Sequence, residues 1–222
     1  TYARHVPTAI VLSEANLAHE LGYVGDWLDS RDFNVQRIYR DELTDNFKFP
    51  AADLLINMGS LSSVATGYIT EHSQREIDKV GHWISAGNNY VGLCFGAQVL
   101  AVALGGEVQR QPLVYKAVVP LDFTGLGTQG PWVRWQEDFI IKAPSAVIDS
   151  RVDEALLIFH AGNAWGVQPH VELTPETLER MAIAIGVSES DYEPLVTALG
   201  TYSEQAQDST SALLDHIWRN LT

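Results

Sequence analysis

Gly92-Leu93-Cys94-Phe95-Gly96-Ala97-Gln98 is the stretch of sequence that decides the fold. The short apolar run at 90–93 predicts a buried strand, and the apolar run after Cys94 predicts a helix. Glycines two positions before and two positions after the cysteine permit a sharp turn, because a Cβ atom at either place would collide with the chain. The segment therefore has the form of a nucleophile elbow, with cysteine in place of serine.

Cys94 is suited to act as a nucleophile at the apex of this turn. The N-terminus of the following helix favours a negatively charged thiolate, and the backbone N–H of Phe95 points to where an oxyanion would form. The alternative is that a lone cysteine is a small buried hydrophobe. The flanking glycines and the strand-to-helix transition favour the elbow.

Gln98 lies one helical turn beyond the cysteine, on the same face of the expected helix. A polar amide in so apolar a run needs partners. It can hold a substrate or bond to neighbouring backbone, and the sequence leaves both interpretations open.

Thiol catalysis also needs a proton carrier, and His170 is the best candidate among seven histidines. An expected strand at 164–168 leads to it, and Glu172 follows two residues later. Positions two apart in an extended segment share a face, so this carboxylate can orient the imidazole. The alternative is a surface histidine near an acid. His160, at the end of another expected strand, is interpreted as structural.

The rest of the chain predicts an α/β fold. Short apolar strands at 9–12, 33–38, 53–57 and 90–93 alternate with helical patterns at 17–28 and 69–86, which indicates a parallel sheet with crossover helices. After Gly106, closely spaced strand candidates follow at 113–120, 132–135, 139–142, 146–149, 156–160 and 164–168. We therefore expect some antiparallel strands in the second half.

Thr174-Pro175-Glu176 is a favourable helix start, because threonine can cap, proline suits the first position and an acid suits the positive end of the dipole. Two or three helices are expected from there to the C-terminus. We expect one domain over 1–222, with the helices of about 174–222 as an appendage. Its core is a mostly parallel twisted sheet, flavodoxin-like, with helices on both faces.

Composition narrows the classes of function. Of the 222 residues 46% are hydrophobic, which suits one sizeable core. The 14 Lys and Arg against 28 Asp and Glu give a net charge of −14, which argues against nucleic-acid or anionic-membrane partners. A single cysteine allows no intramolecular disulfide and favours a reducing, cytoplasmic compartment. No metal-ligand spacing or phosphate-binding glycine loop predicts a cofactor.

In this order, these segments resemble the class I glutamine amidotransferases, whose triad is Cys-His-Glu. Cys94, His170 and Glu172 match that triad, and the stretch 92–106 is similar to the stand-alone members described as GMP synthase-like amidotransferases. The resemblance implies a cysteine attack on the side-chain amide of L-glutamine through a γ-glutamyl thioester. It also implies that the released ammonia passes to a separate synthetase chain, because no ATP-using domain fits in 222 residues.

The same resemblance assigns further roles. Gly59 matches the oxyanion loop after the third strand, and its N–H would pair with that of Phe95. Gln98 would bind the amino-acid end of glutamine. Trp135 and Gln136 match a segment whose backbone lines the glutamine pocket.

Three departures from the family pattern leave the substrate open. Met58-Gly59-Ser60 stands where Gly-Gly-Pro is usual, Gln136-Glu137 replaces His-Gly, and Pro169 precedes the histidine instead of following it. A cysteine hydrolase of another γ-glutamyl or amide substrate, or a non-catalytic regulatory partner with the same fold, remain alternatives. Flavodoxin-like cysteine hydrolases also carry an elbow cysteine, but we would not expect Gln98 or a Gln-x-His-x-Glu segment in them.

Overall fold

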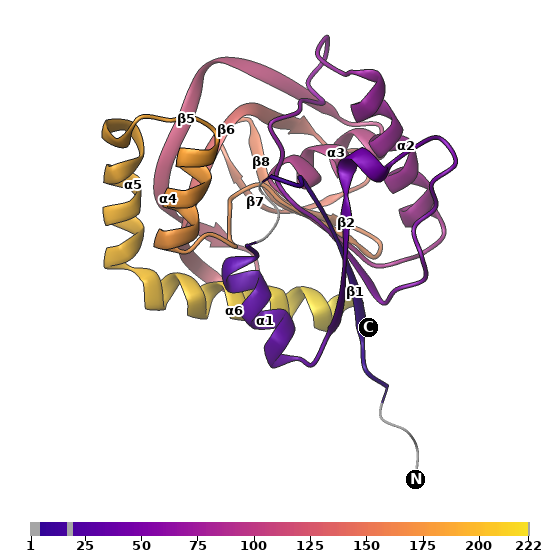
Figure 1. Ribbon diagram of the computed structural model, residues 1–222, viewed down its shortest axis with the longest axis horizontal. Coiled ribbons are helices and arrows are strands. Elements are labelled where there is room, and N and C mark those ends of the chain that lie inside the picture. Colours follow the sequence, from indigo (N-terminus) through magenta and orange to yellow (C-terminus); the bar gives the residue numbers. More distant parts are fainter. Residues whose placement is uncertain (1–4, 17–19, 222) are drawn as a thin grey trace.

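The computed structural model describes residues 5–16 and 20–221 and shows a seven-stranded sheet with a two-stranded ribbon beside it (Figure 1). The strand order of the sheet is β2-β1-β3-β4-β9-β8-β7, and β5 pairs with β6. The strands are β1 Thr8–Ser13, β2 Asn34–Tyr39, β3 Leu54–Asn57, β4 Tyr90–Leu93, β5 Glu107–Phe123, β6 Gly127–Lys142, β7 Val147–Val152, β8 Ala155–Ala161 and β9 Ala164–Val167. The helices are α1 Gly22–Ser30, α2 Glu71–Ser85, α3 Phe95–Ala103, α4 Pro175–Ala184, α5 Glu189–Thr201 and α6 Ser203–Leu221, with a 3₁₀ turn η1 at Arg40–Glu42.

The sheet is parallel from β2 to β9 and antiparallel at its other edge. β1 pairs in parallel with β2 and β3, β3 with β4, and β4 with β9. β8 runs antiparallel to both β9 and β7. The expected mostly parallel sheet with antiparallel strands in the second half is confirmed.

Helices cover both faces of the sheet, as expected. Alternate side chains of β1 point to opposite faces: Val11 packs in a cluster with α1 and α6, and Leu12 packs in a cluster with α2 and α3. In Figure 1, α6 runs beside α1, and α2 and α3 lie together elsewhere on the sheet. The carboxyl ends of β3, β4 and β9 therefore meet at one edge of a core that is covered on both sides.

Two sequence expectations are corrected by the structure. The helix expected at 17–28 begins at Gly22, and residues 17–19 lie outside the described part of the chain. The strands expected at 132–135 and 139–142 are one continuous strand, β6. Polar residues at 136–138 interrupt the apolar run in the sequence, but they do not interrupt the ladder, because backbone groups make its hydrogen bonds with β5.

Helix α4 begins as the sequence predicts. The side chain of Thr174 accepts a hydrogen bond from the Thr177 N–H at 3.2 Å, and Pro175 occupies the first turn. Further along, α6 places Leu213 and Ile217 in the main core. Among the described residues, no helix combines the length and the apolar character needed to cross a lipid bilayer.

Candidate active site

Cys94 occupies a strained turn between β4 and α3. Its φ of +49° and ψ of −105° lie outside the regions that L-residues usually adopt. A Cβ atom added to Gly92 would lie 2.3 Å from the backbone of Gly96, and one added to Gly96 would lie 2.1 Å from the Asn57 carbonyl oxygen. Both glycines are therefore required by close backbone approach, and the turn has the geometry of the expected elbow.

Backbone donors surround the thiol. The N–H of Cys94 donates to Val167 of β9 at 2.9 Å, which continues the pairing of the two strands. A Cβ atom on Gly59 would lie 3.3 Å from Cε1 of His170 and 3.9 Å from Cβ of Cys94, so a side chain at this position of the loop after β3 would contact both residues. Within the described residues, the N–H groups of Gly59 and Phe95 have no protein acceptor. They are free to bind an anionic oxygen.

His170 lies beyond the end of β9, in an extended segment that bridges to β6. Its backbone N–H donates to the Val133 carbonyl at 2.8 Å. Its Nδ1 lies 2.7 Å from Oε1 of Glu172, and the two residues are only 7% and 5% exposed. The structure thus joins the pair that the sequence spacing predicts, and the bridge to β6 fixes the segment that carries it.

Neighbouring elements hold the backbone around Glu172. The N–H of Tyr23 in the first turn of α1 donates to the Glu172 carbonyl at 2.9 Å, and the Thr210 hydroxyl donates to the Val171 carbonyl at 2.8 Å. Gly22 has φ +49°, and a Cβ atom there would lie 1.9 Å from the Glu172 carbonyl oxygen. The start of α1 can approach so closely only because this residue is glycine.

The electrostatics of the pair favour a charged imidazole. Burial lowers the pKa of His170, but the charges of Cys94 and Glu172 and its hydrogen bonds to both raise it well above the usual 6.5. The net effect favours the charged form of His170, which lies beside Glu172 and lines the same cavity as Cys94. Such an arrangement can deliver a proton to a leaving group.

Gln98 and Gln168 form a second layer behind the thiol. Nε2 of Gln168 lies 3.7 Å from Sγ of Cys94, and Nε2 of Gln98 donates to the Asp138 carbonyl at 3.1 Å and to Oε1 of Gln168 at 3.4 Å. Gln98 is 4% exposed. Of the two interpretations that the sequence left open, bonding to neighbouring backbone is therefore present, and the link through Gln168 connects the same amide to the thiol.

Trp135 and Gln136 lie on opposite sides of the ribbon, as neighbours in a strand must. Trp135 lines the cavity beside Cys94. Gln136 is 5% exposed, and within the described residues neither atom of its amide has a hydrogen-bond partner. A buried amide without partners is costly, and Gln136 is not among the residues that line the cavity beside Cys94.

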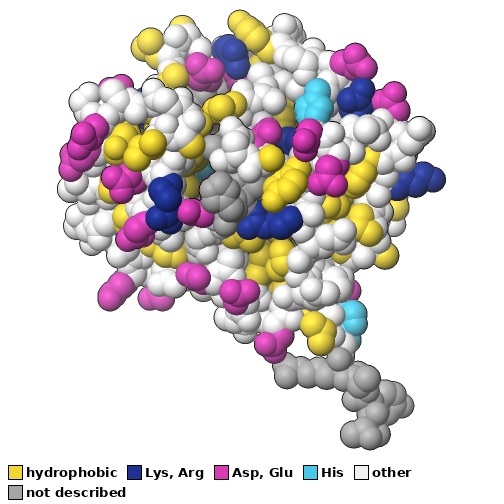
Figure 2. All heavy atoms as spheres, in the orientation of Figure 1, with side chains coloured by type: hydrophobic (Ala, Val, Ile, Leu, Met, Phe, Trp, Pro, Cys, Tyr) yellow, Lys and Arg dark blue, Asp and Glu magenta, His cyan; other side chains and the backbone are white. Residues whose placement is uncertain are grey.

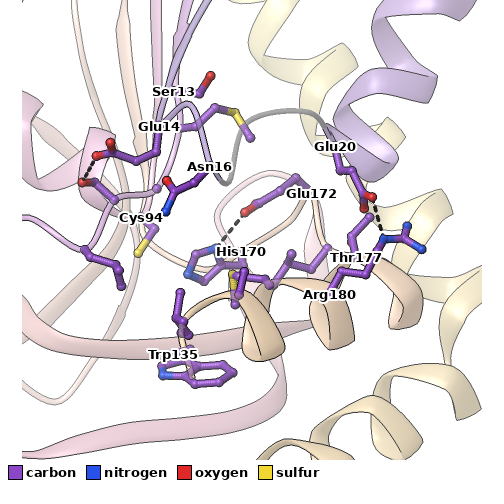
Figure 3. A pocket seen from close by; sticks show the side chains of 18 of the residues that line it. Ser13, Glu14, Asn16, Glu20, Cys94, Trp135, His170, Glu172, Thr177 and Arg180 are labelled. Carbon is purple, nitrogen blue, oxygen red and sulfur yellow. Dashed lines mark hydrogen bonds and ion pairs between the residues drawn. The ribbon is translucent and has the colours of Figure 1, made fainter. Parts of the chain in front are cut away.

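A cavity of about 160 Å³ opens beside Cys94 (Figure 3). Gly59, His170 and Glu172 form its inner wall, and α4 forms much of the outer wall. Arg180 of α4 is paired with Glu20 across its mouth. The apolar members of the lining are Leu21, Met58, Leu61, Leu173, Met181, Ala184 and Ile185.

The described side chains form no metal-binding cluster. Carboxylates are scattered over the face in Figure 2, and Lys and Arg side chains lie singly among them. Between residues 5–16 and 20–221, no group of three or more His, Cys, Asp or Glu is arranged to hold a metal ion.

Sequence reasoning missed three parts of this site. Gln168 stands out in the sequence only as part of a motif, although a glutamine that ends an apolar strand is a signal that its amide meets a partner inside the fold. The buried Arg40, which contacts the loop at Gly59, gives no signal, because a single arginine after a strand is usually exposed. The contribution of α4 to the cavity depends on tertiary packing.

Comparison with known proteins rests on structure. Neither a protein-family model nor a curated protein sequence matches the chain. A glutamine amidotransferase of Thermotoga maritima superposes with a TM-score of 0.81 at 15% identity, covering 98% of each chain. A glutamine amidotransferase of Methylobacillus flagellatus has a TM-score of 0.74 at 18% identity, covering 98% of this chain and 96% of its own. A Thermoplasma acidophilum protein described as one component of a GMP synthase has a TM-score of 0.58 at 17% identity, covering 87% and 99%.

These likenesses extend over nearly the whole chain while the sequences have diverged widely. The chain therefore has the glutamine amidotransferase fold.

Proposed function

We propose that this chain hydrolyses the side-chain amide of L-glutamine, with Cys94 as nucleophile, His170 as acid and base, and Glu172 as the group that orients the imidazole. One observation carries the proposal. A cysteine in a strained turn, with φ +49°, lines the same cavity as a buried histidine whose Nδ1 is held 2.7 Å from a buried carboxylate. A structural cysteine requires neither the strain nor the pair.

The reaction follows from the positions of these groups. The thiolate of Cys94 attacks the amide carbon, and the N–H groups of Gly59 and Phe95 stabilise the tetrahedral oxyanion. His170 gives its proton to the departing nitrogen, which leaves as ammonia and a γ-glutamyl thioester. The neutral imidazole then takes a proton from water, the hydroxide attacks the thioester, and the C–S bond breaks to release glutamic acid and the thiolate beside the protonated imidazole. The acid gives its proton to the released ammonia. No cofactor enters this sequence.

Three residues are proposed to recognise the amino-acid end of glutamine. Trp135 lies in the cavity lining beside the thiol. The backbone amide of Gln136 adjoins Trp135 in β6, and the side-chain amide of Gln98 is joined to Cys94 through Gln168. A ligand carrying both an ammonium and a carboxylate group offers these amides an acceptor and a donor.

The ammonia is proposed to go to a separate amidating chain. The present chain covers 96–99% of the similar structures, so their lengths are about the same. One of those structures is named as a component of a synthase. A free thiol nucleophile works best in a reducing compartment, so we propose that the reaction takes place in the cytoplasm.

A second substrate class is favoured by one observation. The outer wall of the cavity is apolar where α4 faces the thiol, with Met181, Ala184 and Ile185 in the lining. Ammonia needs no apolar contact as it leaves, whereas a substituted amine gains affinity from one. A γ-glutamyl amide of an apolar amine is therefore the alternative substrate.

Comparing the two amides directly tests the proposal. Ammonia release from L-glutamine and aniline release from γ-glutamyl anilide are measured with the same preparation, with Cys94→Ser as the blank. We expect kcat/KM to be higher for glutamine and both activities to vanish in the variant. A preference for the anilide would move the assignment to the alternative, and full activity in Cys94→Ser would exclude the proposed nucleophile.

A further inference from the structure

Arg40 lies fully inside the protein, directly beneath the loop that carries Gly59. Its guanidinium is 1% exposed. Nη2 donates to the Met58 carbonyl at 2.7 Å, and Nη1 donates to the Gly59 carbonyl at 3.1 Å. One planar side chain thus holds two successive carbonyl groups of the loop.

A buried carboxylate balances the charge of this arginine. Nε of Arg40 donates to Oε2 of Glu76 at 3.0 Å, and Glu76 of α2 is 0% exposed. The Asn57 side chain at the end of β3 accepts from Arg40 at 2.7 Å and donates to Oε1 of Glu76 at 2.8 Å. Four elements are therefore tied to one point: η1, β3, α2 and the loop after β3.

The same network reaches the elbow. Nδ2 of Asn57 donates to the Tyr90 hydroxyl at 3.0 Å, and this hydroxyl donates to the Gly96 carbonyl at 2.8 Å. The guanidinium of Arg40 also lies 5.1 Å from the ring centre of Phe95. The two segments whose N–H groups have no protein acceptor among the described residues, at Gly59 and at Phe95, are both in contact with Arg40 or its partners.

The direction of these carbonyls determines where the N–H groups point. In a planar trans peptide the C=O and the N–H of one unit face opposite ways. Holding the Met58 carbonyl on Arg40 therefore turns the Gly59 N–H away from the arginine. Gly59 lines the same cavity as Cys94 and His170, and a Cβ atom on it would lie within 4 Å of both, so we take that direction to lead into the active site.

A contribution to the stability of the fold does not by itself explain the buried ion pair of Arg40 and Glu76. Removing two charges from water costs free energy that the pair only partly recovers, and apolar residues of similar size often serve as well. We propose that Arg40, held by Glu76, is a positioning residue that aims the Gly59 N–H at the reaction oxyanion. This inference rests on the proposed role of Cys94 as an acyl-accepting nucleophile.

Two reactions of the single thiol separate positioning from folding. Acylation of Cys94 by p-nitrophenyl acetate passes through a tetrahedral oxyanion, whereas alkylation by iodoacetamide displaces iodide and forms none. The test variant is Arg40→Met/Glu76→Met, which removes both charges together and leaves neither unpaired. Arg40→Lys keeps the charge but cannot span two carbonyls, so it serves as a milder second variant. Arg31→Met, which breaks the surface pair with Asp215, is the matched control.

We expect the acylation rate of the double variant to fall by about 10²-fold, the effect of losing one oxyanion donor, while the alkylation rate stays within about threefold of wild type. Arg40→Lys should fall by a smaller factor in acylation alone, and Arg31→Met should change neither rate. With glutamine, kcat should fall and KM should stay the same.

Two results would overturn the inference. One is an unchanged acylation rate in a folded Arg40 variant, and the other is an equal loss of acylation and alkylation, which would assign Arg40 to the fold or the thiol. A wild-type chain that acylates but releases no ammonia from glutamine would contradict the proposed substrate alone. The comparison of Arg40 variants by p-nitrophenyl acetate would still decide the role of the arginine.

Discussion

Nδ1 of His170 lies 2.7 Å from Oε1 of Glu172, and both residues are more than nine-tenths buried. A carboxylate at this nitrogen fixes the orientation of the ring and leaves the other nitrogen for Cys94, which lines the same cavity. The contact accounts for a buried acid that would otherwise be costly.

Weakening this contact should slow turnover without stopping it. We expect Glu172→Gln to reduce kcat by about 10²- to 10⁴-fold, because the amide can favour the wrong imidazole tautomer while nucleophile and base remain. His170→Ala should abolish amide hydrolysis. Steady-state ammonia release measures both variants.

The chain supplies a matched control for these variants. His160 of β8 is paired with Asp149 at 2.7 Å, and it lies outside the lining of the cavity beside the thiol. His160→Ala should therefore retain activity. Wild-type turnover in His170→Ala would show that the base is wrongly assigned.

The raised pKa of His170 also predicts a pH dependence of stability. Because the folded pKa exceeds the unfolded value of about 6.5, the folded state holds a proton that the unfolded state has released. The contribution to the free energy of unfolding is complete below about pH 6.5 and is lost as pH rises through the folded pKa. The free energies of unfolding of wild type and His170→Ala, measured with urea, should therefore converge as the pH rises.

A second variant checks the cause of that pKa shift. Cys94→Ser removes one of the two negative neighbours, so it should lower the His170 pKa and end the convergence at a lower pH. If the difference in free energy of unfolding between wild type and His170→Ala stays constant with pH, a charged imidazole in the folded protein is contradicted.

The elbow glycines should tolerate no side chain. A Cβ atom on Gly96 would lie 2.1 Å from the Asn57 carbonyl oxygen, so Gly96→Ala should destabilise the fold by about 3 kcal/mol or more. Gly81, in α2, has no atom within 4 Å of the same position. Gly81→Ala should therefore stabilise by about 0.5–1 kcal/mol. Thermal unfolding measures the stability of both variants. Equal effects of Gly96→Ala and Gly81→Ala would contradict the close approach of Gly96 to the Asn57 carbonyl.

Much of the sheet could be predicted from the sequence, because its strands are short and apolar. The strand expected at 90–93 has those limits in the structure, and β1, β2 and β3 differ by about one residue at an end. The two-stranded ribbon of β5 and β6 was harder to predict. β6 contains Gln136, Glu137 and Asp138, and polar residues in a paired strand resemble a loop when only the sequence is read.

The site was predictable only where local pattern determines geometry. The elbow and the His170–Glu172 spacing follow from turn and strand periodicity, whereas the layer behind them depends on residues far apart in the chain. Arg40, Asn57 and Glu76 meet through three different elements. No local sequence pattern indicates that these three residues are in contact.

The unpaired amide of Gln136 allows protein stability and substrate binding to be tested with the same variant. Replacing it by methionine removes a buried group without partners among the described residues, so Gln136→Met should raise the melting temperature. If the amide binds glutamine, the same change should raise KM. Gln98→Met, which breaks two hydrogen bonds, should instead lower stability. A Gln136→Met variant with unchanged KM would remove this residue from the proposed pocket.

Covalent labelling tests the central claim most directly. A glutamine analogue with a diazo-ketone in place of the carboxamide requires both an activated thiolate and a pocket for the amino-acid end. We predict one adduct per chain by intact-mass measurement, slower labelling in excess glutamine, and no adduct in Cys94→Ser. Since Cys94 is the only cysteine, the mass identifies the site. If iodoacetamide labels Cys94 while the analogue leaves it unmodified, glutamine is not the substrate and the account is contradicted.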